Sequence, residues 1–184
     1  MVNSNDLKNG MTIVYENNIY QVIEFMHVKP GKGAAFVRTK LRNLRTGSVT
    51  DKTLNAGVKL QKANIDKTPM QYLYRSDFFV FMDNETYEQV EVPTEQLEKE
   101  SKFIKEGMTV DLIFYGTEIL GVTLPDKVTL EVVQCDPAVK GDTKTNALKD
   151  AITETGLLVK VPMFINQNDS IVVNTSTGKY DSRA

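Results

Sequence analysis

The chain has 184 residues, of which 41% are hydrophobic and 25% charged, with a formal net charge of −2. These proportions are ordinary for a globular protein, and no stretch approaches the roughly 20 apolar residues of a membrane span. No basic segment followed by an apolar core opens the chain, so we expect no secretory signal and a cytoplasmic location. One cysteine (Cys135) and one histidine (His27) give poor support to a disulfide, a zinc site or a Cys–His catalytic pair.

The charge is unevenly distributed along the chain. Residues 1–62 hold ten Lys/Arg and four Asp/Glu, a net charge of +6. Residues 63–126 hold five and thirteen, a net charge of −8, and residues 127–184 hold seven of each. This asymmetry indicates that the first third of the chain meets a polyanion and the middle third does not.

Short strand-like stretches dominate residues 1–63. Residues 11–14, 19–26, 35–41 and 49–54 are rich in β-branched and aromatic side chains, with turns at 16–18 and 46–47. This spacing predicts a small SH3-like barrel of five strands.

Between two of these strands, residues 28–35 read Val-Lys-Pro-Gly-Lys-Gly-Ala-Ala. Pro30 fixes φ near the value of a turn, while Gly31 and Gly33 admit positive φ. The tip therefore has one long side chain, Lys32, whose stem carries its ammonium group on the order of 6 Å from the backbone. Such a tip can enter a narrow cleft in a partner, although the spacing alone favours a plain solvated turn.

The strand after the tip alternates in character. Val37, Thr39 and Leu41 are expected on one face, with Arg38, Lys40 and Arg42 on the other, and Arg45 at the next turn. The stripe fits phosphate binding or the wet face of a half-buried strand, and the basic first third favours phosphate. The candidate phosphate-binding residues are Lys29, Arg38, Lys40, Arg42 and Arg45.

Residues 64–126 predict a second barrel, of the OB type. A linker is expected at 64–69, followed by strands at 70–75, 78–82, 88–92, 108–115 and 119–124. The most helix-like stretch of the chain is 94–104, where Thr94 is placed to cap and Gly107 follows the end.

Residues 127–184 predict a third small β-barrel. Strands are expected at 128–133, 157–161, 171–174 and 179–180, while 147–152 fits a strand or a short helix. Cys135 is expected to be a packed small side chain. The predicted fold is therefore all-β, with three consecutive small barrels.

Motifs of catalysis are missing from the sequence. Gly31-Lys32-Gly33 lacks the hydroxyl residue that a phosphate-binding P-loop requires, and neither Gly-x-Ser-x-Gly nor His-Glu-x-x-His occurs. The acidic residues at 95, 98 and 100 fit a solvated face. Gly141-Asp142-Thr143 fits an ordinary Asx turn by its pattern alone.

The chain resembles bacterial elongation factor P along its whole length. The resemblance lies in the run 29–36 and in the last third: 141–143, 154–156, 161–162, Phe164, 177–178, Tyr180 and Arg183. It implies an SH3-like, KOW-type domain at 1–63 and OB-like domains at 64–126 and 127–184. The archaeal and eukaryotic relative that carries hypusine has the first two barrels only.

The resemblance also implies a function. Members of this family are monomers without cofactor, metal or catalytic residues of their own. They bind the ribosome between the exit and peptidyl sites, beside peptidyl-tRNA, and relieve stalling at consecutive prolines. Lys32 would reach the tRNA CCA end and be extended by a modifying enzyme, with Pro30, Gly31 and Gly33 shaping its loop. Gly141, Asp142 and Thr143 would meet the exit-site codon of the mRNA.

Three residues of the last third depart from the family pattern: Asn168 replaces a common glycine, Asn174 an aspartate and Ser176 an arginine.

Three other functions compete with the leading one. The elongation-factor-P-like paralogue is disfavoured by the intact loop around Lys32. A general single-stranded nucleic-acid binder would need aromatics among Lys/Arg, yet the aromatic-rich middle is acidic. An enzyme with a catalytic lysine would need Lys32 desolvated.

Overall fold

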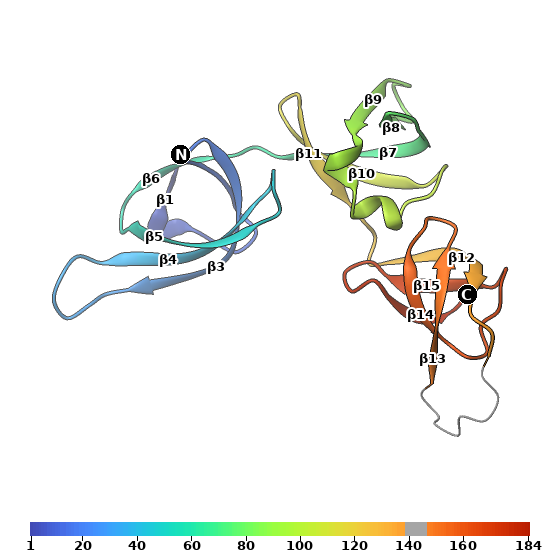
Figure 1. Cartoon of the computed structure of the whole chain (residues 1–184). Coiled ribbons are helices and arrows are strands. Elements are labelled where there is room, and N and C mark those ends of the chain that lie inside the picture. The colour runs from blue at the N-terminus through green and yellow to red at the C-terminus, as the bar shows by residue number, and fades with distance from the viewer. Residues whose placement is uncertain (139–146) are drawn as a thin grey trace. The chain divides into compact units, whose positions relative to one another are not determined.

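The computed structural model describes residues 1–138 and 147–184, which fold into three β-sheets (Figure 1). The strand orders are β1-β6-β2-β3-β4-β5, β11-β10-β7-β8-β9 and β14-β13-β12-β15-β16. Among the described residues there is no α-helix, only three short 3-10 turns, and none of their helices has the length and apolarity needed to cross a membrane. The predicted all-β class is confirmed.

The first sheet has six strands and not the five predicted: it includes all four stretches expected from the sequence and two short strands, β1 and β6. The six strands are β1 (Val2–Asn3), β2 (Thr12–Tyr15), β3 (Asn18–Val28), β4 (Phe36–Asn43), β5 (Val49–Asn55) and β6 (Lys59–Lys62).

The other two sheets have five strands each. The second holds β7 (Asp66–Arg75), β8 (Phe78–Met82), β9 (Gln89–Pro93), β10 (Thr109–Tyr115) and β11 (Glu118–Thr123). The third holds β12 (Lys127–Cys135), β13 (Leu148–Thr153), β14 (Leu158–Pro162), β15 (Ser170–Asn174) and β16 (Lys179–Arg183). The stretch 147–152, left open between strand and helix, is thus largely a strand.

By packing, the described residues form two compact units. The first comprises residues 1–67 and 113–121, and the second 68–112 and 122–184. The division into domains at 1–63, 64–126 and 127–184 stays a prediction.

The alternation predicted for β4 is confirmed. Val37 and Leu41 are fully buried and Thr39 is 3% exposed, while Arg38 and Arg42 are exposed. The Thr39 hydroxyl donates to the Lys52 carbonyl oxygen at 2.9 Å, which satisfies this polar group on the buried face. The buried face packs into a core formed by Leu7, Ile13, Tyr20, Val22, Leu41, Leu54 and Leu60.

The linker expected at 64–69 is wrong, because β7 already begins at Asp66. Ala63 is 1% exposed and Ile65 packs with it against Ile19, so this polar-looking stretch has apolar anchors. The Thr12 hydroxyl also donates to the Ala63 carbonyl oxygen at 2.7 Å.

The helix expected at 94–104 is also wrong. Two 3-10 turns, η2 (Thr94–Leu97) and η3 (Glu100–Lys102), occupy the stretch, and no side-chain hydrogen bond caps η2. Leu97 and Ile104 are its buried residues, while Phe103 packs against the core of the third sheet. Burial of these few separated side chains in different places prevails over the local preference for one continuous helix.

The third sheet encloses a core of Val128, Leu130, Val132, Ala151, Val159, Val161, Ile165, Ile171 and Val173. Cys135 is half-buried against this core, as expected, and its Sγ lies 3.9 Å from the Ile165 carbonyl oxygen.

Two of the three departures from the family pattern have a structural explanation. Asn168 has φ of 71°, a left-handed conformation that glycine and asparagine adopt more readily than other residues. The Asn174 side-chain oxygen accepts hydrogen bonds from the backbone N–H groups of Ser176 and Thr177, at 3.0 and 3.1 Å. An aspartate would accept the same two bonds, so asparagine preserves this turn.

Candidate functional site

The β3–β4 hairpin extends beyond the core of its sheet (Figure 1, left). The two strands pair as far as Val28 with Phe36, and residues 29–35 close the hairpin. The buried residues of β3 lie in its first half, whereas the consecutive residues 24–27 are all exposed. The outer half of β3 is therefore an exposed edge, whereas the facing end of β4 pairs with β5 and buries Val37, so residues 29–35 are the part that extends beyond the paired strands.

The tip of the hairpin is exposed throughout residues 29–34. Gly33 has φ of +108°, whereas Gly31 lies outside the positive-φ region, so one of the two glycines uses its conformational freedom. A Cβ built on Gly33 would lie 3.8 Å from Pro30 Cγ, an ordinary contact distance. Backbone conformation and not crowding is therefore what requires glycine there.

Lys32 stands at the centre of this tip. Within the described residues, its ammonium group has neither a hydrogen bond nor an ion pair. An unpaired ammonium on a short exposed loop is a mobile point charge with three donors, suited to binding an anionic or carbonyl group of a partner.

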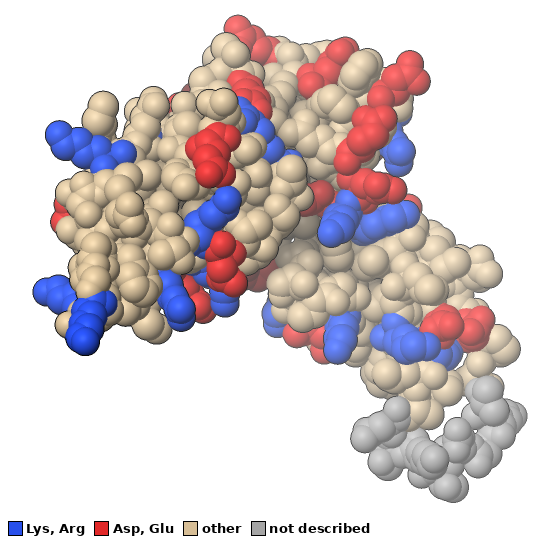
Figure 2. All heavy atoms as spheres, turned by 60° about the vertical axis from the view of Figure 1, so that its left-hand side comes forward, with Lys and Arg blue, Asp and Glu red and all other residues tan. Residues whose placement is uncertain are grey.

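The basic stripe lies on the exposed face of β4. Lys40 pairs with its cross-strand neighbour Glu24 at 3.4 Å. Arg38 faces Met26 and Thr53 across the sheet, and Arg42 faces Gln21 and Val49, so neither arginine has an acidic residue directly opposite. On the face drawn in Figure 2, lysine and arginine side chains stand out at several points of the unit that carries the hairpin.

Arg45 is held in a different way from the stripe. Its guanidinium makes a bidentate pair with Glu118, with Nε to Oε1 at 2.7 Å and Nη2 to Oε2 at 2.9 Å, and Nη1 donates to the Asn17 carbonyl oxygen at 2.7 Å. These hydrogen bonds hold the pKa of the Glu118 carboxyl below its usual value. Phosphate binding by Arg45 stays a prediction, and it would have to compete with this carboxylate.

The remaining candidate residues are of two kinds. Lys29 is exposed beside the tip, as expected for a phosphate-binding residue. Gly141, Asp142 and Thr143 lie outside the described residues. No group of three or more potential metal ligands occurs in the described part of the chain.

Sequence reasoning missed two features of this site. Glu118 is 73 residues from its partner Arg45, and no local pattern links the two. Phe25 and His27 form an edge-to-face ring pair with centroids 5.6 Å apart, on the exposed outer half of β3. Their spacing of two residues in a strand places them on one face, which was the available signal.

Three consecutive parts of the chain match the domains of one family. Residues 3–60 match the elongation factor P (EF-P) KOW-like domain, residues 65–122 its OB domain, and residues 128–183 its C-terminal domain. Elongation factor P from Onion yellows phytoplasma (strain OY-M) is 58% identical over 185 residues, covering 100% of this chain and 98% of that protein. The chain belongs to the elongation factor P family. Elongation factor P from Phytoplasma australiense is 57% identical over 185 residues, with the same coverage of both chains.

Membership of the elongation factor P family assigns the chain a role in translation elongation, in a family of translation factors and not of recognised enzymes. Among solved structures, eukaryotic translation initiation factor 5A from Methanococcus jannaschii matches with a TM-score of 0.52 and 24% identity, over 66% of this chain and 92% of that one. An initiation factor 5A family protein from Naegleria fowleri ATCC 30863 gives 0.51 and 16%, over 67% and 94%. At these identities the likeness concerns the fold alone.

Proposed function

We propose that this chain binds the ribosome between the exit and peptidyl sites, beside peptidyl-tRNA, and promotes peptide-bond formation when consecutive prolines are joined. In this proposal Lys32 reaches the CCA end of the tRNA. The observation that carries it is the exposed hairpin tip, where Lys32 has no partner among the described residues. A catalytic lysine would instead need a desolvated position.

The physical role of the tip is to orient and not to react. Proline is a poor acceptor because its ring restricts the geometry of attack. Correct orientation of two reactants reaches roughly 7–11 kcal/mol in ideal intramolecular cases, and only a fraction of that is available where the ribosome already aligns both substrates. Ordering the Lys32 side chain opposes the effect by up to about 2 kcal/mol. Contacts of the ammonium with RNA phosphates and 2′-hydroxyls would offset this cost.

The stripe on β4 supplies the second part of the proposal. Arg38 and Arg42 flank Lys40, and with Lys29 they would contact the phosphates of the tRNA backbone. Arg45 joins them if a phosphate displaces Glu118. The net charge of +6 in residues 1–62 supports this orientation of the chain towards RNA.

Three further parts of the proposal follow from the family. A lysine-modifying enzyme acts on Lys32, which the exposed tip leaves accessible. Gly141, Asp142 and Thr143 meet the mRNA codon in the exit site. The protein works in the cytoplasm as a monomer. The intact mass of the protein purified from its own host measures the modification directly.

The test is Lys32→Ala in a strain that makes a reporter with three consecutive prolines. Reporter yield should fall, while ribosome binding persists at reduced strength. Lys62→Ala, an exposed lysine of the same unit on β6, is the matched control and should leave the yield unchanged. Lys32→Arg keeps the charge and separates the need for a cation from the need for a lysine that can be modified.

Two results would overturn this function. One is a normal reporter yield in the Lys32→Ala strain. The other is salt-sensitive binding to free single-stranded oligonucleotides as tight as binding to ribosomes, measured by fluorescence anisotropy, since that is the behaviour of a general nucleic-acid binder.

A further inference from the structure

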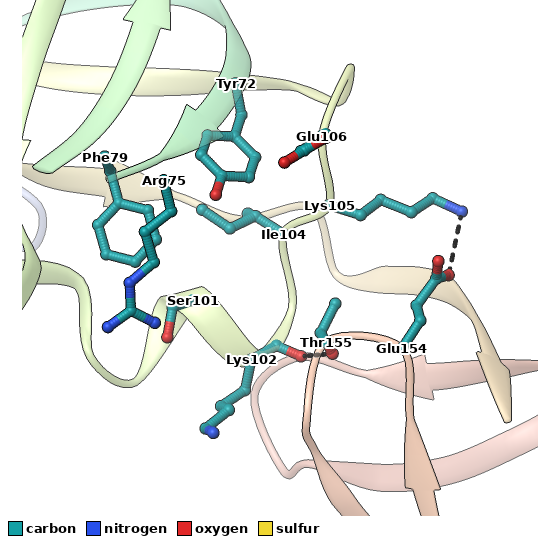
Figure 3. Close-up of a pocket in the computed structure, with 10 residues that line it drawn as sticks. All are labelled: Tyr72, Arg75, Phe79, Ser101, Lys102, Ile104, Lys105, Glu106, Glu154 and Thr155. Carbon is teal, nitrogen blue, oxygen red and sulfur yellow. Dashed lines mark hydrogen bonds and ion pairs between the residues drawn. The ribbon is translucent and has the colours of Figure 1, made fainter. Parts of the chain in front are cut away.

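A polar pocket of about 410 Å³ lies in the second compact unit (Figure 3). Its walls come from the ends of β7 and β8, from residues 101–106 and from the turn between β13 and β14. The Thr155 hydroxyl donates to the Lys102 carbonyl oxygen at 2.5 Å, which joins the turn to the 3-10 segment. The 3-10 segment and the β13–β14 turn, two of the walls, are thus held together by a hydrogen bond within the chain.

Basic residues gather in this pocket against the charge of their surroundings. Residues 63–126 contain five lysines and arginines against thirteen acidic residues, yet three of the five, Arg75, Lys102 and Lys105, line the pocket. Because the region as a whole is acidic, this concentration of basic residues is particular to the pocket.

Two of these three cations have no acidic partner. Lys105 pairs with Glu154 at 3.5 Å, but neither Arg75 nor Lys102 has an ion pair with any described residue. In Figure 3 the Arg75 guanidinium lies on the left and the Lys102 side chain runs downward from its backbone, while the Lys105–Glu154 pair and Glu106 lie on the right. The pocket therefore has two cations without an acidic partner, and a second group of three charges, Lys105, Glu154 and Glu106, that sum to −1.

Arg75 is oriented for binding by its neighbour. Its guanidinium carbon lies 5.1 Å from the centroid of the Phe79 ring, and Phe79 is 2% exposed, so the ring is a fixed surface for stacking. Stacking occupies the face of the guanidinium and leaves its edge donors available. The buried ring of Tyr72 points its hydroxyl into the same space, and no described residue accepts a hydrogen bond from it.

We propose that this pocket binds a phosphate group between the Arg75 guanidinium and the Lys102 ammonium. The planar edge of arginine suits two phosphate oxygens, and the lysine adds a point charge. The source is a phosphodiester of RNA or a free phosphate, which present the same oxygens. The site is independent of the role proposed for Lys32.

The test uses the full chain and follows backbone amide and arginine side-chain signals by NMR during titration with inorganic phosphate. Signals of Tyr72, Arg75 and residues 101–102 should shift and saturate together. Arg75→Gln and Lys102→Gln should each weaken binding about fivefold or more, because each removes a charge-assisted donor in a partly solvated site. Lys99→Gln is the matched control, an exposed lysine next to η3 that does not line the pocket, and should change binding less than twofold.

A second variant tests the sign of the electrostatics. Glu106→Gln removes a negative charge from the pocket and should strengthen phosphate binding, a result that loss of folding could not produce. Unfolding curves for all four variants separate weak binding from instability.

A parallel titration with a short single-stranded RNA identifies the source. RNA that shifts the same signals, and loses this effect in Arg75→Gln, assigns the site to a phosphodiester. Shifts with inorganic phosphate alone assign it to a free phosphate. Absence of saturable shifts with both probes, or equal weakening by Lys99→Gln and Arg75→Gln, overturns the proposal.

Discussion

The two glycines beside Lys32 make different demands, and a pair of alanine substitutions measures the difference. Gly33→Ala places a side chain on a backbone with φ of +108°, whereas Gly31→Ala meets no such strain and no heavy atom within 4 Å. Alanine also restricts the unfolded chain, which stabilises the native state by about 0.4–1 kcal/mol at a compatible site. That gain is common to both variants and cancels in the comparison.

The difference between the two variants therefore isolates the native strain. A non-glycine residue in a left-handed conformation costs about 1–2 kcal/mol, and the new Cβ adds no collision because Pro30 Cγ is 3.8 Å away. We expect Gly33→Ala to be less stable than Gly31→Ala by about 1–2 kcal/mol, unless the exposed loop relaxes to a different conformation. Relaxation would move Lys32 and lower the proline reporter yield in place of stability.

Urea unfolding followed through the amide signals of β3 and β4, together with the proline reporter, measures both alternatives. Gly31→Ala should match or exceed the wild type in stability and keep reporter yield. Equal stability and equal yield for the two variants, or a larger loss in Gly31→Ala, would refute the assignment of backbone strain to Gly33.

Two other predictions concern charges of the first unit. Arg38→Gln should reduce the slope of the logarithm of the ribosome-binding constant against the logarithm of salt concentration by about one. Lys40→Gln should change this slope less, because Glu24 already neutralises Lys40. Equal changes of slope for the two variants would contradict this order. Because the carboxyl pKa of Glu118 is lowered in the folded state, its pairing with Arg45 stabilises the fold above the unfolded-state pKa and loses this effect as pH falls through the folded-state value. Glu118→Gln should therefore flatten the acid side of the stability profile measured by urea unfolding, and an unchanged profile would show that the pair contributes nothing in solution.

Strands could be predicted from the sequence where one face is buried and the other is exposed to solvent. β4 is the clearest case, since Val37, Thr39 and Leu41 alternate with Arg38 and Lys40, and the structure buries the first three. An alternating pattern of this kind is decided by the strand itself, because a shift of one residue would expose every apolar side chain. The turn that carries Lys32 could also be predicted, since proline restricts the backbone locally and glycine frees it.

Features set by distant parts of the chain were not predictable from local patterns. Residues 94–104 carry helix-forming side chains, yet Phe103 packs against the core of the third sheet and the stretch forms two 3-10 turns. The Arg45–Glu118 pair joins residues 73 apart, and the sequence near either one gives no sign of the other. In both cases a partner brought close by the fold decides the outcome.

The same distinction explains how a single lysine can carry a function in the proposed role. The paired ends of β3 and β4 fix the two ends of the tip, so binding has to order the Lys32 side chain and the short loop that carries it. The larger entropic cost is that of ordering the strands. Burial of one face of β4 offsets this cost during folding, before any partner is present. A glycine-rich loop of the same length without the paired strands would keep the charge of Lys32 and lose this advantage. The position of the lysine, more than its chemistry, is therefore what the first sheet provides.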